Sequence, residues 1–423
     1  MTLVSELELP AFDSTDPSIR GERFHELIGE LRAKGWLAQG PYGYIVLDRE
    51  AGEFFLRTRS AIFPGMKIAE IFGVSKGALY EQMRRNILHV NGPDHTRLRS
   101  LVNPSLSARA VERYRPAMRG FMQELFAQAT AGAVPAGSNG ASAGERTFTC
   151  EFVEAFAKPY PSLTIAAVMG APAEDAPRLH HWSNWIQKQF DAQSMANEIE
   201  QIEQAVEEFY VYARALVKAR RTDPGDDLIS KLIEAEDQGD RLDEEECINL
   251  VFNVLVGGVD TSQSQLAHTI RLLAEHPDQW ERLVADPMLA GQAVEEGLRY
   301  EPITPFTARI TTEEVSFRDV TFPEGTVVMV CAFTGNRDLD EDAGGEGGPQ
   351  RFDITAERGK ARALTFGAGV HYCLGANLAR VELQEALTFL APRLKDLELD
   401  DEPVYESISG IYGLAELPIR FSL

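Results

Sequence analysis

One cysteine of the chain lies in a glycine-bearing loop, where its sulfur could bind a metal or act as a nucleophile. The loop spans Phe366–Gly375 with the sequence FGAGVHYCLG, and an amphipathic helix is expected directly after it, over 375–394. Gly367 and Gly369 permit backbone turns that a Cβ atom would hinder. Cys373 stands where the helix begins, so the positive end of the helix dipole and its unpaired N–H groups favour a thiolate.

Two other roles fit the residue type of Cys373 taken alone. A lone cysteine is commonly an inert buried residue. The other role is that of a nucleophile activated by His371. Catalytic cysteine–histidine pairs usually come from separate elements of the fold, whereas these two residues lie only two positions apart. The complete ten-residue pattern argues against both.

A second constellation stands in the middle of a helix expected over 244–275, with Asp243 as its N-cap. The segment reads Gly257-Gly258-Val259-Asp260-Thr261. Two adjacent glycines cost roughly 1 kcal/mol each inside a helix, relative to alanine, so they need a reason. The Thr261 hydroxyl could bond the Gly257 carbonyl and open the helix beside a flat ligand or a small gas molecule. A close helix–helix crossing at the glycines is the alternative.

The cysteine loop matches the F-G-x-G-x-H-x-C-x-G signature of the cytochrome P-450 family at every fixed position, so the chain resembles that family. The resemblance implies heme b with Cys373 as the axial ligand of the iron, whose thiolate promotes O–O bond cleavage. The helix segment resembles the family's A-G-x-D/E-T motif, with Gly257 in place of alanine. By resemblance, Asp260 and Thr261 are catalytic and handle the protons that oxygen activation consumes.

The same resemblance assigns further residues to the cofactor and the fold. Glu296 and Arg299 resemble the E-x-x-R motif, a buried structural ion pair, with Arg351 as its third member. An exposed ion pair of little worth is the alternative. The two propionates of heme need cationic donors. The residues expected to bind the cofactor, besides Cys373, are His95, Arg99, Arg309, Phe366, Gly367, His371 and Gly375.

A basic segment interrupts an otherwise acidic chain. Residues 95–120 hold six arginines and one glutamate, whereas the whole chain has a formal charge of −24. Such a run is usually a solvated helix face. The alternative is a docking patch for an acidic electron-transfer partner, which the family resemblance favours.

The expected fold is mainly α with small β-sheets, an α+β cytochrome P-450 fold that holds heme between the long oxygen-side helix and the cysteine loop. We expect one heme domain over residues 1–423, with flexible insertions at about 131–144 and 339–348. Helices are expected over 22–34, 108–130, 150–170, 196–221, 244–275, 289–300 and 375–394. Strands are expected at 44–47, 315–317, 327–330 and 417–421.

The composition of the chain limits the cellular compartment and the classes of partner that we expect. The net negative charge argues against nucleic acid or an anionic membrane as the main partner. The first residues lack the pattern of a signal peptide, and no apolar stretch reaches the roughly 18–20 residues of a membrane span. Four scattered cysteines indicate a reducing compartment. We therefore expect a cytoplasmic protein without an anchor, acting as a monomer.

The implied reaction is the insertion of one oxygen atom of O2 into a small, largely apolar organic substrate, with hydroxylation as the first expectation. The four cysteines do not form an iron–sulfur cluster motif, so electrons would come from a separate ferredoxin and its NAD(P)H-dependent reductase. A peroxide-driven peroxygenase and a heme protein that binds without oxygenating are the alternatives. The residues expected to line the substrate pocket are Val254, Gly257, Gly258, Thr304, Phe306, Ile411 and Tyr412, with parts of 62–90 and 180–200.

Overall fold

The computed structural model describes residues 1–132, 147–237, 242–339, 348–358 and 362–423. Helices dominate these residues, and the strands form small sheets, as expected from the sequence. The two predicted insertions, 131–144 and 339–348, lie outside the described residues except at their ends. No helix in the described ranges is both long and apolar enough to cross a membrane.

Eighteen α-helices are present in the described residues. They are α1 (Glu22–Lys34), α2 (Arg49–Arg57), α3 (Met66–Ile71), α4 (Ala78–Arg85), α5 (Gly92–Val102), α6 (Ala108–Val111), α7 (Arg115–Gly132), α8 (Pro159–Met169), α9 (Ala176–Gln187), α10 (Ala192–Asn197), α11 (Ile199–Thr222), α12 (Leu228–Asp237), α13 (Glu244–Gly258), α14 (Asp260–Glu275), α15 (Pro277–Ala285), α16 (Ala290–Tyr300), α17 (Ala332–Arg337) and α18 (Ala376–Leu390).

The strands are short. They are β1 (Thr2–Leu3), β2 (Leu37–Gln39), β3 (Tyr44–Val46), β4 (Ala61–Ile62), β5 (Thr147–Glu151), β6 (Phe306–Thr311), β7 (Val315–Phe317), β8 (Val320–Phe322), β9 (Val327–Cys331), β10 (Lys395–Leu399), β11 (Val404–Tyr405), β12 (Leu414–Glu416) and β13 (Pro418–Ser422). Their sheets have the orders β2-β3-β9-β6-β4, β1-β8-β7, β10-β13-β5 and β11-β12.

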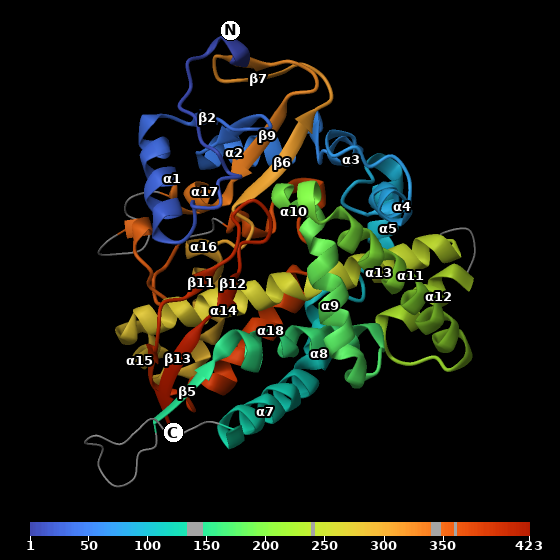
Figure 1. Ribbon diagram of the computed structural model, residues 1–423, viewed down its shortest axis with the longest axis vertical. Coiled ribbons are helices and arrows are strands. Elements are labelled where there is room, and N and C mark those ends of the chain that lie inside the picture. The colour runs from blue at the N-terminus through green and yellow to red at the C-terminus, as the bar shows by residue number, and fades with distance from the viewer. Residues whose placement is uncertain (133–146, 238–241, 340–347, 359–361) are drawn as a thin grey trace.

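The largest sheet joins strands near the N-terminus to two strands from the later part of the chain, β6 and β9. β3 pairs in parallel with β9, and β6 pairs antiparallel with β9 on its other side. A separate apolar core, which includes Phe55, Phe322 and Val330, packs against this sheet. Figure 1 shows the sheet above the main helical layer. It therefore forms one wall of the space between the sheet and the helices.

The main core is helical, and α13 and α14 run through its centre (Figure 1). Asp243 and Glu246 form a capping box at the start of α13, with a distance of 2.7 Å from the Glu246 backbone nitrogen to Asp243 Oδ1. Six consecutive residues, Cys247–Phe252, are buried, because α13 packs against α11, α12, α8 and α9. α14 then packs against α16 and α18, which places it beside the helix that follows the cysteine loop.

The structure changes one helix that the sequence predicts. The first two residues of the helix expected over 150–170, Cys150 and Glu151, belong to β5, which pairs with β13 at five consecutive positions. A short π-helix over Val153–Ala157 follows. The regular helix, α8, begins only at Pro159. The pairing partner of β5 lies at the far end of the chain, so local patterning does not reveal the strand.

Candidate functional site

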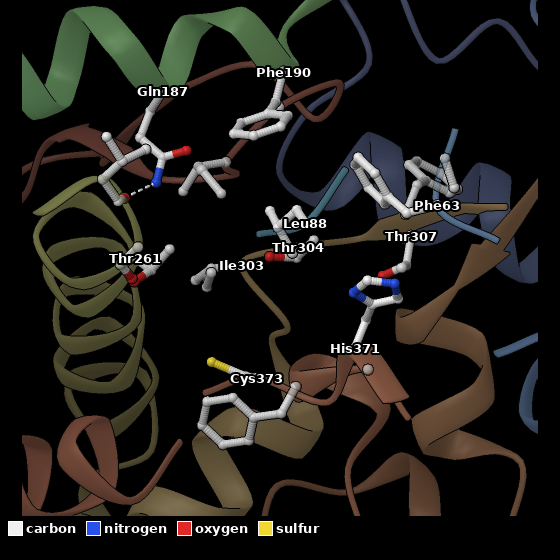
Figure 2. A pocket seen from close by; sticks show the side chains of 18 of the residues that line it. Phe63, Leu88, Gln187, Phe190, Thr261, Ile303, Thr304, Thr307, His371 and Cys373 are labelled. Carbon is white, nitrogen blue, oxygen red and sulfur yellow. Dashed lines mark hydrogen bonds between the residues drawn. The ribbon is translucent and has the colours of Figure 1, made fainter. Parts of the chain in front are cut away.

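A cavity of about 450 Å³ lies between the α13–α14 helix pair and the cysteine loop. Both predicted chemical segments border it, because its lining includes Gly257, Thr261 and Cys373. Figure 2 shows the Cys373 sulfur directed into the open space on one side and Thr261 on the helix across from it. The structure thus brings together residues more than a hundred positions apart in the chain.

Two glycines with positive φ shape the cysteine loop. Gly367 has φ 67° and Gly369 has φ 73°, a region that favours glycine. A Cβ on Gly369 would also lie 2.5 Å from the Leu56 carbonyl oxygen. The Cys373 N–H donates to the Phe366 carbonyl at 2.9 Å, which closes the loop just before α18. The cysteine is thereby fixed by backbone contacts.

The electrostatics around the Cys373 sulfur act in both directions. Burial raises the pKa of the thiol, whereas the Gly375 backbone N–H and the nearby Arg99 charge lower it. The sulfur therefore lies in an apolar setting that already contains the donors a thiolate needs. A positively charged group bound in the cavity would favour the thiolate form of Cys373 further.

The helix expected over 244–275 is interrupted at the two glycines, as the sequence indicates. α13 ends at Gly258, α14 begins at Asp260, and the Thr261 hydroxyl donates to the Gly257 carbonyl at 2.7 Å. A Cβ on Gly257 would meet nothing within 4 Å, whereas one on Gly258 would collide with the buried Ile165 side chain of α8. The sequence suggested two reasons for the glycines, and each holds for one of them. Gly257 leaves room beside the cavity, and Gly258 permits α13 to pack closely against α8.

Asp260 and Thr261 point in different directions. Thr261 lines the cavity, whereas Asp260 is buried and is not part of its lining. The Asp260 carboxyl group accepts hydrogen bonds from Ser183 and, at 3.4 Å, from Asn184, both on α9. Burial raises the pKa of Asp260. The carboxyl group is therefore held behind the helix.

Four basic side chains meet at one side of the cavity: His95, Arg99, Arg309 and His371. The rings of His95 and His371 lie 4.3 Å apart. Burial lowers the pKa of Arg99 and brings that of Arg309 to about 10. Burial and the neighbouring basic groups lower the pKa of His371 to about 3.

In the described part of the chain, the two arginines of this cluster bind backbone carbonyls rather than carboxylates. Arg99 donates to the Tyr372 carbonyl, and Arg309 donates to the Ala308 carbonyl at 2.8 Å. Within the part of the chain that the structure describes, neither guanidinium pairs with a carboxylate. Buried charges are normally paired, so this cluster suits an anionic ligand with more than one negative charge.

Comparison with known proteins places this geometry in a family. The cytochrome P-450 family model matches residues 170–401. Luteothin monooxygenase of Streptomyces thioluteus is 32% identical over 98% of this chain and 96% of its own length. The chain belongs to the cytochrome P-450 family. Erythromycin C-12 hydroxylase of Saccharopolyspora erythraea is 31% identical over 93% of each protein. The solved structure of CalO2 superposes with a TM-score of 0.85 at 29% identity, covering 98% of this chain and 99% of that one.

Family membership confirms the cofactor and the enzyme class expected from the sequence. Cytochromes P-450 bind heme b, and the relatives are named as monooxygenases, hydroxylases and epoxidases. The chain is accordingly a heme-dependent oxidoreductase of the monooxygenase type. The cavity fits the group: Cys373 offers the sulfur, and the basic cluster offers the donors that would hold two propionates. Phe366, Gly367 and Gly375 also line the cavity.

The predicted ion pair is present, but its third member is different. Glu296 and Arg299 are buried and form two contacts of 2.7 Å. The third member is Arg358, whose Nη2 donates to Glu296 Oε1 at 2.7 Å. Arg351 contributes its backbone carbonyl, which accepts from Arg299, while its exposed guanidinium lies 3.8 Å from Asp278. The sequence offers two arginines in one irregular segment and no signal to choose between them.

Four of the six arginines in the basic segment 95–120 form ion pairs with carboxylates. Most of its charge is neutralised by carboxylates from the segment itself and from other helices, and Arg99 faces the cavity. The ion pairs are Arg97 with Glu246, Arg113 with Asp226, Arg115 with Glu112 and Glu385, and Arg119 with Glu385. A local count of charges does not include partners that are distant in sequence, so the folded segment has less excess charge than its sequence indicates. Its role as a docking patch for an electron-transfer partner stays a prediction.

The predicted substrate lining is mostly in place. The lining includes Val254, Gly257, Gly258, Thr304, Phe306 and Ile411. Tyr412 is the exception, because it is fully buried away from the cavity and its hydroxyl accepts the Gly21 N–H at 2.9 Å. The windows 62–90 and 180–200 supply Phe63, Leu88, Gln187 and Phe190 (Figure 2). Thr15 and Tyr42 also line the cavity, and no sequence signal pointed to them.

Proposed function

We propose that this cytochrome P-450 hydroxylates a small, largely apolar organic molecule, using electrons from a separate ferredoxin and its NAD(P)H-dependent reductase. One observation supports the proposal most directly. The Cys373 sulfur and the Thr261 side chain border the same cavity. Beside them lies a basic cluster whose arginines have no carboxylate partner among the described residues. This arrangement provides a ligand for iron, donors for the propionates and an oxygen-side threonine in a single space.

The overall reaction balances with external electrons. A C–H bond of the substrate becomes C–OH, and O2, two electrons and two protons give that oxygen atom and one water. Bound heme supplies the oxidising power for this step. The protein must then position the substrate, exclude bulk water and deliver two protons.

We assign the handling of protons to Thr261 and Asp260. The Thr261 hydroxyl proton is used in the bond to Gly257, so the free lone pairs of its oxygen face the cavity as acceptors. A water held there can pass a proton onward. Asp260 lies one residue away, behind the helix, where burial raises the pKa of its carboxyl group. It would therefore act on the cavity through Thr261 and water rather than directly.

The lining supports an apolar, uncharged substrate. Away from the basic cluster, the lining side chains are mostly apolar, among them Phe63, Leu88, Phe190 and Phe306. The one other charged residue of the lining is Lys67, which pairs with Glu70 at 2.9 Å. A charged substrate would find no partner among the described residues next to Thr261. Relatives named for luteothin and erythromycin act on organic products, and we extend that substrate class to this protein.

The electron source distinguishes this proposal from a peroxygenase. Product formation should require NADPH, reductase and ferredoxin, and hydrogen peroxide alone should support turnover poorly. Efficient turnover with peroxide and none with the electron-transfer proteins would favour the peroxygenase instead. Binding of candidate compounds, followed by the shift in heme absorbance, would first identify a substrate for the assay. A ligand that binds but yields no product under either condition would favour a non-oxygenating heme protein.

Cys373→Ser tests the iron ligand separately. The variant should lose the carbon monoxide difference spectrum that marks a thiolate-bound heme. The matched control is Cys331→Ser, because Cys331 is a buried cysteine outside the lining of the cavity. An unchanged spectrum in Cys373→Ser would contradict the assignment. We also expect one heme domain that acts as a monomer in the cytoplasm, which size determination and cell fractionation would check.

A further inference from the structure

The break between α13 and α14 leaves backbone carbonyls that need partners. The last four carbonyls of any helix lack an intrahelical donor, and in α13 these belong to residues 255–258. The Gly257 carbonyl is satisfied by Thr261. The Val256 carbonyl is satisfied from another helix, because the Gln187 side-chain amide at the end of α9 donates to it.

Three side chains on α9 donate hydrogen bonds to residues on the two sides of the break between α13 and α14. Ser183 and Asn184 donate to Asp260, and Gln187 donates to the Val256 carbonyl. Gln187 comes four residues after Ser183 and three after Asn184, so its side chain lies on the same side of α9 as both. Of the three, Gln187 alone is part of the cavity lining. A single side chain therefore contacts both the oxygen-side helix and the space for the substrate.

The orientation of the Gln187 amide is determined by its partner. A carbonyl can only accept, so the NH2 group must face Val256 and the Oε1 atom must face away. Figure 2 shows the amide oxygen on the side opposite the dashed bond, above Thr261. Among the described residues, no hydrogen-bond donor to this oxygen is present. It is an acceptor that an apolar ligand would leave unpaired when it displaces water.

We propose that Gln187 is a positioning and specificity-determining residue. Its Nε2 keeps the helix break open by binding the Val256 carbonyl, and its Oε1 accepts a hydrogen bond from a hydroxyl or N–H group of the substrate. This inference rests on the proposed function, because it takes the cavity to be the substrate site. It narrows the substrate class to apolar molecules with a hydrogen-bond donor.

Hydrogen exchange tests the Nε2 contact without any turnover. In heme-loaded protein, Gln187→Met should speed amide exchange in peptides that cover 254–262 by about tenfold, because a buried carbonyl loses its donor. Gln189→Met is the matched control. Gln189 is also buried and also lines the cavity, but it follows α9, and its amide donates at 2.9 Å to the Ile186 carbonyl of α9 rather than to α13. Unchanged exchange in Gln187→Met, or an equal effect in the control, would overturn this half of the proposal.

A pair of isomeric probes tests the Oε1 contact. Decan-1-ol and methyl nonyl ether have the same atoms, but only the alcohol has a hydrogen-bond donor. By calorimetry, native protein should bind the alcohol about threefold to tenfold more tightly. Gln187→Glu keeps acceptor oxygens and should keep the preference, and Gln187→Met should lose it. Equal affinities in native protein, or a preference that persists in Gln187→Met, would overturn the assignment. Neither assay measures product formation. Failure of the Gln187 proposal can therefore be distinguished from failure of the proposed hydroxylation, which is tested by turnover.

Discussion

The buried carboxylate of Glu296 allows a direct comparison of two arginines. Arg358 has an 11% exposed side chain and makes two contacts with Glu296, of 2.7 and 3.3 Å. Arg351 is 47% exposed and lies 3.8 Å from an exposed partner, Asp278. We therefore predict that Arg358→Met destabilises the protein strongly, whereas Arg351→Met, which keeps its backbone carbonyl, does not.

The magnitude follows from the number and burial of the lost bonds. A hydrogen bond to a charged group contributes about 1.5–3 kcal/mol, and one of the two bonds from Arg358 to Glu296 is long. Arg358 also donates to the Gly348 and Arg351 carbonyls, at 2.9 and 2.8 Å. Arg299 remains to pair with Glu296, so the expected loss is about 3 kcal/mol, near the lower end for a broken buried pair. An exposed ion pair such as that of Arg351 contributes less than about 1 kcal/mol.

Urea unfolding of the heme-loaded protein would measure both values. Circular dichroism and heme absorbance should give coincident transitions, which would justify a two-state analysis. The midpoint should fall clearly for Arg358→Met and stay close to native for Arg351→Met. Equal losses for the two variants, or a loss below about 1 kcal/mol for Arg358→Met, would refute the geometry described for Glu296.

Three further predictions concern the helix break and a buried histidine. Gly258→Ala should lower the unfolding free energy by about 1–2 kcal/mol, since its Cβ would collide with Ile165, whereas Gly257→Ala should not, because its Cβ has open space; denaturant unfolding of both variants would check this. Thr261→Ala should retain heme and substrate binding but release more hydrogen peroxide per NADPH consumed, and equal coupling would remove Thr261 from the mechanism. Burial lowers the pKa of His89 from 6.5 to about 4, so the unfolded state binds the proton more tightly. Its contribution to stability is complete above pH 6.5 and is lost as pH falls toward 4, by up to about 3 kcal/mol. The difference in unfolding free energy between native protein and His89→Phe should shrink over that range, and a constant difference would contradict the assignment.

Local sequence predicted the chemical segments well, because their function depends on short-range geometry. The turns at Gly367 and Gly369, and the bond from Thr261 to Gly257, follow from residue type and spacing alone. The family motif then predicted heme, which family membership confirms, and the role of Cys373, which stays a prediction.

Contacts between distant segments were not predictable in the same way. Arg358 and Arg351 differ only in which guanidinium the chain folds toward Glu296. Tyr412 resembles a cavity residue by type, but its hydroxyl binds the Gly21 backbone, nearly four hundred residues away. Gln187 has no motif at all, and its importance depends on a carbonyl that becomes available only because another helix is broken.

The pairing of β3 with β9 sets an order of events during synthesis. Tyr44 pairs opposite Val328, so the N-terminal strands leave the ribosome long before their partner exists. At about 5–20 residues per second, they wait on the order of tens of seconds. Arg309 lies on β6, which also pairs with β9. The basic wall of the cavity is therefore completed late, and if it holds the heme propionates as proposed, heme would bind firmly only after most of the chain has been made.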